Sequence, residues 1–242
     1  MKDLNEFSEF DVPINTYPNV INDRGMDYKI LALITLYSKR KGEAVCDMME
    51  YDYSEIENHR YIYNDMIIKD MEEFEKLSNN CKKTIKRNIK KLVDCDNKVV
   101  QICKDKNGKI FYKINPYFNP NDKNSMSSFV VIDSEMLKYL INISNSDTIK
   151  IYCIFKWLLW DGKEKKYTKK KVDRYWLCKQ LGLAEDSGKN LKKVGDILQN
   201  LVNNYYLKRE KQNIQDKDGN YKTVYFYEVC SYEYWKENYR KK

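Results

Sequence analysis

Two long segments of the chain carry apolar residues at helical spacing. The segment 28–42, YKILALITLYSKRKG, is apolar at most positions and predicts a mostly buried helix that ends at Gly42. The segment 146–162, SDTIKIYCIFKWLLWDG, predicts a second buried helix, since Lys150 and Lys156 interrupt it too often for a membrane span. The chain contains no uncharged apolar run of about 18 residues or more, and its N-terminus is polar and acidic. We therefore expect no contact with a membrane and no secretion signal, which favours a cytoplasmic protein.

The first buried helix is followed by a short helix, a turn, a basic helix and a β-hairpin. The pattern places the short helix at about 70–77, and Ser78, Asn79 and Asn80 form a turn with good N-capping residues. The basic helix is then CKKTIKRNIKKLVDC, at 81–95. Two β-rich runs, KVVQIC and KIFYKIN, flank the turn DKNG at 105–108, which is a strong hairpin signal.

The same order of elements returns in the second half of the chain. A short helix in VDRYWLCKQLGL is followed by the helix SGKNLKKVGDILQNLVNNYY, and LKREKQNI and YKTVYFYEV flank the turn DKDG at 216–219. This is the order of a winged helix-turn-helix, and its repetition after about 100 residues indicates duplicated domains. We predict an α+β, helix-rich fold with two tandem winged helix-turn-helix domains.

Pro, Gly and Asn-rich stretches give the expected domain boundaries. Residues 1–25, with two prolines and a glycine, are expected to form an extended N-terminal arm. The first domain then spans 26–118 with an acidic insertion at 43–57, inside a stretch, 43–68, that is expected to be irregular apart from one short strand or helix. Residues 119–128 form the linker. The second domain spans 129–242 and opens with a strand and a helix in FVVIDSEMLKYLINIS.

Charge is segregated along the chain. Residues 1–75 carry 8 basic and 17 acidic side chains, net −9, whereas residues 76–242 carry 36 and 19, net +17. A composition bias would enrich lysine everywhere, so this split favours a surface that faces a polyanion. The alternative is a solvated surface without a partner.

The basic helix at 81–95 is amphipathic. Its apolar positions fall on one face and its cations on the other, which suits a helix that enters the major groove of DNA. Arg87 is the side chain there that can bind guanine bidentately, and lysines supply affinity for phosphate. The alternative is an ordinary amphipathic helix. The expected buried residues are Cys81, Ile85, Ile89, Leu92 and Val93, and the candidate DNA contacts are Lys82, Lys83, Thr84, Lys86, Arg87, Lys90, Lys91 and, in the hairpin turn, Lys106.

The corresponding helix of the second half is less charged and richer in amides, which suits adenine readout. The basic segment 163–174, KEKKYTKKKVDR, is expected to be a loop that grips phosphate, with a solvated loop as the alternative. The expected buried residues are Leu191, Val194, Leu198, Leu201, Val202 and Tyr205, and the outward ones are Lys189, Lys192, Lys193, Asp196, Gln199, Asn200 and Asn203. The candidate DNA contacts are Lys169, Lys170, Lys171, Lys189, Asn190, Lys192, Lys193 and Asn200.

The sequence gives little indication of a metal site, a disulfide framework or a nucleotide-binding site. The seven cysteines contain no CxxC pair, and His59 is the only histidine, so neither a zinc finger nor a disulfide framework fits. No phosphate-binding glycine motif occurs. A tyrosine nuclease would need an Arg/His cluster or a metal around its nucleophile. We expect no catalytic site, no metal and no cofactor.

In layout the sequence resembles the tandem winged-helix replication initiator proteins of plasmids and phages. The resemblance rests on the order of elements over 26–230, the helices CKKTIKRNIKKLV and SGKNLKKVGDILQNLV, and the twin turns DKNG and DKDG. It implies two related domains that bind direct repeats in double-stranded DNA at an origin, often with homodimerisation through the first domain. It also implies replication proteins, a helicase or a polymerase, as partners.

Two other functions remain open at this stage. One is a transcriptional regulator or partition-type DNA-binding protein of a mobile element, which a single palindrome over the promoter would favour. The other is a protein-interaction module that docks through the acidic segment, which an absence of DNA affinity at low salt would favour. Iterated repeats in DNA next to the gene would favour the initiator.

Overall fold

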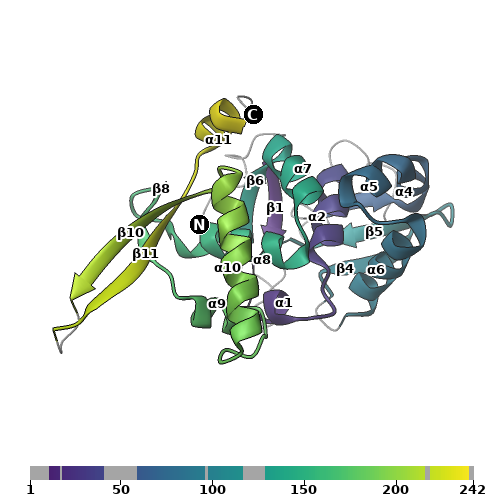
Figure 1. Cartoon of the computed structure of the whole chain (residues 1–242). Helices are drawn as coiled ribbons and strands as arrows, with labels where there is room; N and C mark the ends of the chain where they lie inside the picture. The colour runs from purple at the N-terminus through teal and green to yellow at the C-terminus, as the bar shows by residue number, and fades with distance from the viewer. Residues whose placement is uncertain are drawn as a thin grey trace. The chain divides into compact units, whose positions relative to one another are not determined.

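A computed structural model of the chain describes residues 11–16, 18–40, 59–95, 98–116, 129–215 and 219–239. They form a mixed α+β fold, as the sequence predicts, and the chain divides into two compact units, residues 1–149 and 150–242. Figure 1 colours the first unit purple to teal and the second green to yellow. None of the helices in the described ranges is long and apolar enough to cross a bilayer.

The helix α2 (Tyr28–Tyr37) lies at the centre of the first unit, and its residues from Tyr28 to Thr35 are buried. Its N-cap is Asp27, whose carboxylate accepts hydrogen bonds from the backbone N–H groups of Lys29, at 3.0 Å, and Ile30, at 3.3 Å. The helix ends before Ser38, earlier than the predicted Gly42, because the chain turns extended and forms β2 (Lys39–Arg40).

The middle of the first unit has the predicted order of helices followed by a hairpin. It comprises α4 (Asn64–Lys69), α5 (Met71–Ser78), α6 (Lys82–Asp94), β4 (Val100–Lys104) and β5 (Ile110–Ile114). β4 and β5 pair antiparallel around the turn at 105–108, which confirms the hairpin. Residues 59–68, expected to be irregular apart from one short strand or helix, contain both β3 (Arg60–Tyr63) and most of α4, whereas the acidic insertion at 43–57 lies outside the described residues.

β3 makes the hairpin part of a larger sheet. It pairs antiparallel with β5, so that the strand order is β2-β3-β5-β4. The side chain of Arg60, which is buried, donates from Nε to the Ser38 hydroxyl, at 2.8 Å, and from Nη2 to the Ser38 carbonyl, at 2.7 Å. These bonds fix the sheet to the C-terminal end of α2.

The first unit also contains segments that were expected to lie in the extended N-terminal arm and in the second domain. β1 (Asp11–Asn15) pairs antiparallel with β6 (Phe129–Asp133), and a short helix, α1 (Pro18–Asn22), follows it. Residues 11–15 are extended, as expected of the arm, but Val12 and Ile14 are only 2% and 1% exposed because β1 packs against α2. The N-terminal segment from residue 11 onward is therefore part of the core.

The division of the chain differs from the expected one for the same reason. α7 (Ser134–Ile143) follows β6 and packs on α2 and α5, and Lys29 Nζ donates to the carbonyl of Ser144, at 2.7 Å. Burial lowers the pKa of Lys29, against the raising effect of Asp27. Residues 129–149 thus belong to the first unit rather than opening the second, and the expected linker at 119–128 lies outside the described residues.

The second unit starts within α8 (Ser146–Leu158) and continues through short strands into a helix pair and a long hairpin. Its elements are β7 (Trp160–Asp161), β8 (Lys166–Tyr167), β9 (Lys170–Lys171), α9 (Arg174–Gln180), α10 (Gly188–Asn203), β10 (Leu207–Gln215), β11 (Tyr221–Val229) and α11 (Tyr232–Tyr239). β10 and β11 pair antiparallel along nine residues each, as the predicted hairpin requires, although the turn residues 216–218 lie outside the described ranges.

Aromatic side chains fill much of the core of the second unit. Tyr206 packs edge-on against Tyr152 with ring centroids 5.2 Å apart, and it also contacts Trp235 of α11. Phe155 of α8 packs edge-on against Tyr227 of β11. These tyrosines serve as core residues.

The two units share one arrangement of strands around the helix pair. In the first unit β3 precedes the helices and lies beside β5, the second strand of the hairpin. In the second unit β9 precedes α9 and α10 and lies beside β11, again the second strand of the hairpin. The three-stranded orders β3-β5-β4 and β9-β11-β10 therefore correspond strand by strand.

The place of β1 in the core can be tested by truncating one side chain. The variant Ile14→Ala is expected to lower the free energy of unfolding by about 2–5 kcal/mol, since it leaves a cavity beside α2. The matched variant Ile102→Ala, at a side chain 52% exposed on β4, should change it by less than about 0.5 kcal/mol. Urea unfolding measures both. Equal effects of the two variants would mean that residues 11–15 lie outside the core.

Candidate nucleic-acid interface

The helix α6 buries a narrow aliphatic stripe. Ile85, Ile89 and Leu92 are buried, whereas Val93 is half-buried and Cys81 is exposed. Three of the five residues predicted for the buried face are thus confirmed. Cys81 differs because it is the N-cap residue and precedes the first helical turn. The stripe at positions i, i+4 and i+7 fixes how the helix is rotated about its axis.

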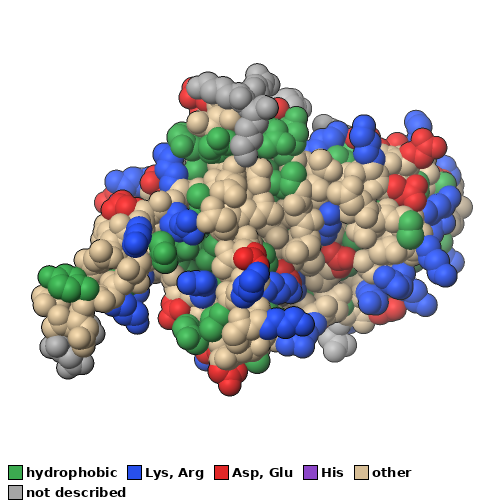
Figure 2. Space-filling view, viewed as in Figure 1, with side chains coloured by type: hydrophobic (Ala, Val, Ile, Leu, Met, Phe, Trp, Pro, Cys, Tyr) green, Lys and Arg blue, Asp and Glu red, His purple; other side chains and the backbone are tan. Residues whose placement is uncertain are grey.

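The opposite side of α6 is cationic. The exposed residues there are Lys82, Lys83, Lys86, Arg87, Lys90 and Lys91, and Thr84 is half-buried. None of these cations takes part in an ion pair within the described part of the chain. In Figure 2, basic side chains gather over α6 at the right of the view, and acidic ones lie above them over α4 and α5. The sequence prediction of a cationic helix face is confirmed.

Two hydrogen bonds position α6 within the unit. Asn88 Nδ2 donates to Asp27 Oδ2, at 2.6 Å, so the carboxylate that caps α2 also holds α6. Glu75 of α5 accepts from the backbone N–H of Lys82, at 2.5 Å, and so satisfies a free donor in the first turn of α6. Sequence analysis did not single out Asp27, Asn88 or Glu75, because both contacts join separate helices.

A tight turn connects α5 to α6. Ser78 donates from its hydroxyl to the Phe74 carbonyl, at 2.6 Å, and Asn79 adopts the left-handed conformation with φ 52°. Asparagine tolerates this region better than most residues. The predicted turn at Ser78, Asn79 and Asn80 is therefore present, although Cys81 rather than one of these residues is the N-cap.

The hairpin turn between β4 and β5 is ordered by Asp105. Its carboxylate accepts hydrogen bonds from the backbone N–H groups of Asn107 and Lys109, both at 2.8 Å, and Gly108 has φ +76°. Lys106 is exposed in this turn. Two chain segments of the first unit, α6 and the hairpin turn, thus each present lysine to solvent.

In the second unit, α10 buries the residues Val194, Ile197, Leu198 and Leu201. Three of them were predicted, and Ile197 was missed. Leu191 and Val202 are half-buried, and Tyr205 lies beyond the helix with φ +61°. Lys189, Lys192, Lys193, Asp196 and Asn203 are exposed, as predicted, whereas Asn190, Gln199 and Asn200 are half-buried.

Polar side chains of α10 are engaged with protein groups. Lys192 pairs with Asp196, at 2.9 Å, and Gln199 donates to Asn203 Oδ1, at 2.6 Å. Asn190 donates to the Ala184 carbonyl, at 3.0 Å, and Asn200 accepts from Asn204, at 2.6 Å. A DNA base that binds these amides would have to replace their protein partners. The sequence does not show that the amides are already hydrogen-bonded within the protein.

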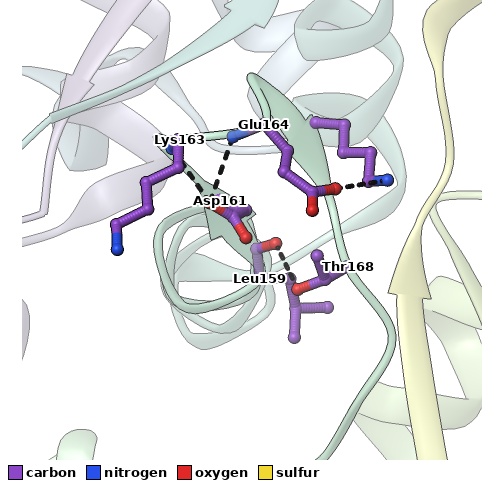
Figure 3. Close-up of polar contacts among 6 residues, drawn as sticks. Leu159, Asp161, Lys163, Glu164 and Thr168 are labelled. Atoms are coloured by element: carbon purple, nitrogen blue, oxygen red, sulfur yellow. Dashed lines mark hydrogen bonds and ion pairs between the residues drawn. The ribbon is translucent and has the colours of Figure 1, made fainter.

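The basic segment at 163–174 is more structured than the loop that was expected. Figure 3 shows Asp161 accepting from the backbone N–H groups of Lys163, at 2.9 Å, and Glu164, at 3.3 Å, and Thr168 donating to the Leu159 carbonyl, at 3.2 Å. These bonds close the turn between β7 and β8, in which Glu164 also pairs with Lys166. The segment then continues into β9 and the start of α9.

The three lysines proposed there do not form one cluster. Lys170 lies opposite Tyr227 in the β9–β11 register, and Lys171 lies opposite Phe226. Since neighbouring residues of a strand point to opposite faces, Lys170 is on one face of the sheet, and Lys171 and Lys169 are on the other. Lys169 pairs with Glu210, and Lys170 donates to the Leu158 carbonyl, at 2.9 Å.

Two arginines lie beside α10. Arg209 of β10 donates from Nη2 to Gln199 Oε1, at 2.8 Å, and Arg174 of α9 lies against Gly195. Both are exposed. Arg174 is the last residue of the basic segment 163–174, whereas no local pattern marks Arg209, whose partner Gln199 is 10 residues away in the chain.

The described residues hold no group of three or more His, Cys, Asp or Glu side chains arranged to bind a metal ion. No protein family and no curated protein matches the chain. Among solved structures, the chain is similar to the crystal structure of Pi initiator protein in complex with iteron DNA. The two are 11% identical, the match covers 93% of this chain and 99% of that one, and the TM-score is 0.43. A likeness of this degree assigns neither fold nor function.

Cys81 gives a probe at the beginning of α6. Its Sγ lies 3.4 Å from Thr84 Oγ1, and the Thr84 hydroxyl, together with backbone N–H groups of the first turn, lowers the pKa of the thiol. Burial raises the pKa of Cys103. Because the thiolate is the reactive form, iodoacetamide should label Cys81 at lower pH than Cys103.

Bound duplex DNA should slow this labelling if it covers the start of α6. The labelled cysteines are identified by peptide mapping, and Cys81→Ser should remove the fast signal. An unchanged labelling rate of Cys81 with DNA bound would place the DNA elsewhere.

Proposed function

We propose that each unit is a winged helix-turn-helix domain and that the chain is a sequence-specific double-stranded DNA-binding protein. The observation that carries this proposal is the arrangement that occurs twice: a strand, a helix pair and a hairpin whose second strand lies beside the first strand. In both units the second helix of the pair buries one stripe and exposes cations on the other side. A helix with these two faces can enter a major groove while it stays anchored in its domain.

In the first unit, α6 acts as the recognition helix and the β4–β5 hairpin as the wing. The lysines of α6 contact phosphates, which line both walls of the groove and carry no base information. Arg87 is the residue of this face that can bind a guanine edge bidentately. The absence of carboxylate partners for these cations among the described residues leaves their charge available to phosphate.

In the second unit, α10 acts as the recognition helix with a different balance of groups. Lys189, Lys192 and Lys193 are exposed, and Lys192 shares its charge with Asp196. Gln199 is hydrogen-bonded to Asn203, and Asn200 accepts a hydrogen bond from Asn204. Adenine readout by these amides requires exchange of protein hydrogen bonds for base hydrogen bonds, so their contribution to affinity is smaller than the number of amides suggests.

The biological role that fits two such domains in one chain is initiation of DNA replication at an origin with repeated sites. Two recognition helices in a single chain can occupy a direct repeat without dimerisation, whereas one domain would need a second copy. In this role the protein needs no catalytic site or cofactor, and it recruits a helicase or polymerase. A regulator of transcription would use the same DNA-binding surface, and the arrangement of its DNA sites would distinguish the two.

The proposal is tested by the salt dependence of binding. If about six phosphates are neutralised, the logarithm of affinity should fall with the logarithm of salt concentration at a slope of about −5. The double variant Lys86→Gln/Lys90→Gln should reduce the size of this slope by about 2 and weaken binding to all duplexes alike. Fluorescence anisotropy with labelled duplexes across a salt series measures both quantities.

A matched control is Lys69→Gln/Lys76→Gln, which makes the same charge change at exposed positions of α4 and α5. This control should keep the slope and most of the affinity, because these helices lie outside the proposed interface. Absence of binding at about 50 mM salt, or an affinity that salt does not change, would refute a nucleic-acid function.

A further inference from the structure

Arg209 is held in a fixed orientation at the junction of the β10–β11 hairpin with α10. Its Nη2 donates to Gln199 Oε1, at 2.8 Å, and its Cζ lies 5.1 Å from the centre of the Tyr225 ring. Gln199 is in turn fixed by Asn203. A long exposed side chain normally loses rotamer entropy when it binds a ligand, and these contacts reduce that loss in advance.

Arg174 is placed beside the same helix by a glycine. A Cβ at Gly195 would lie 3.0 Å from Arg174 Nη1, closer than a side-chain carbon normally approaches. Glycine inside a helix costs about 1 kcal/mol relative to alanine. The missing side chain at position 195 gives the guanidinium room to lie against the helix.

The two guanidinium groups line one flank of α10. Gly195 and Gln199 are four residues apart and thus lie on successive turns, about 6 Å apart along the axis. Burial raises the pKa of Tyr227, and both Arg209 and Arg174 oppose that rise. Neither arginine has a carboxylate in an ion pair within the described residues.

We propose that Arg174 and Arg209 form a two-guanidinium clamp for the DNA phosphate backbone along the Gly195–Gln199 flank of α10. The proposal rests on the proposed function, in which α10 occupies a major groove whose walls are phosphates. Two like charges that lack carboxylate partners attract an anion, and guanidinium binds phosphate bidentately. The flank position places the pair beside the backbone rather than over the base edges.

The clamp is tested in the full chain with Arg174→Ala, Arg209→Ala and the double variant. Each single variant should reduce the size of the salt slope by about 1, and the double variant by about 2, with the same fold-loss on a selected site and on a scrambled duplex. The control is Lys208→Ala, which removes an exposed cation next to Arg209 on the opposite face of the β10–β11 hairpin and should leave slope and affinity unchanged.

Gly195→Ala provides a second variant that keeps every charge. Its methyl group makes the Arg174 guanidinium shift by a few tenths of an ångström, so binding should weaken, though less than in Arg174→Ala, while the helix itself becomes more stable by up to about 1 kcal/mol. Thermal unfolding monitored by circular dichroism shows that the loss of binding is not a loss of fold.

The outcomes separate the clamp from the function on which it rests. If the wild-type chain binds DNA and the double arginine variant has the same salt slope, the clamp is wrong and the DNA-binding function is supported. If the arginine variants lose affinity only for the selected site and not for the scrambled duplex, the clamp is also wrong, because that result would mean that the arginines read bases. No binding by the wild-type chain at low salt would overturn both.

Discussion

The burial of one aliphatic stripe on each of the helices α6 and α10, the proposed recognition helices, is the constraint on which the rest of the structure depends. In α6 the stripe is Ile85, Ile89 and Leu92, and in α10 it runs from Val194 to Leu201. Each stripe must face the core of its unit, so it sets the rotation of the helix and thereby the side chains that face solvent. The cationic face of α6 follows from this rotation together with the bond from Asn88 to Asp27, which also caps the central helix α2.

The two units use the same arrangement with different surfaces. α6 exposes six cations without carboxylate partners among the described residues, so its interaction with a polyanion is mainly electrostatic. α10 instead carries an ion pair and an amide network that extends through Gln199 to Arg209 of the hairpin. The first unit is thus suited to strong, weakly selective contact, and the second to contact through groups held in fixed positions.

The sequence was informative where the signal was local. The periodicity of 81–95 and 187–206 predicts α6 and α10 with most of their buried residues, and the glycine turns predict both hairpins. The strand β9 was missed, and β3 was expected only as one short strand or helix at an unspecified place in 43–68. The two strands have two and four residues, too few for a period to show, and are stabilised by pairing with distant strands. The division at residue 149 was missed because β1 and β6, far apart in sequence, pair with each other. The contacts of Arg174 and Arg209 with α10 are long-range and could not be predicted from the sequence.

In the proposed function, one chain contacts DNA with two recognition helices. Hydroxyl-radical footprinting of the full chain, on a duplex selected by it from a random pool, distinguishes this mode of binding from contact by a single helix. We expect two protected segments about one helical turn apart on the same face of the duplex. A single protected segment no longer than one recognition helix can cover would contradict it.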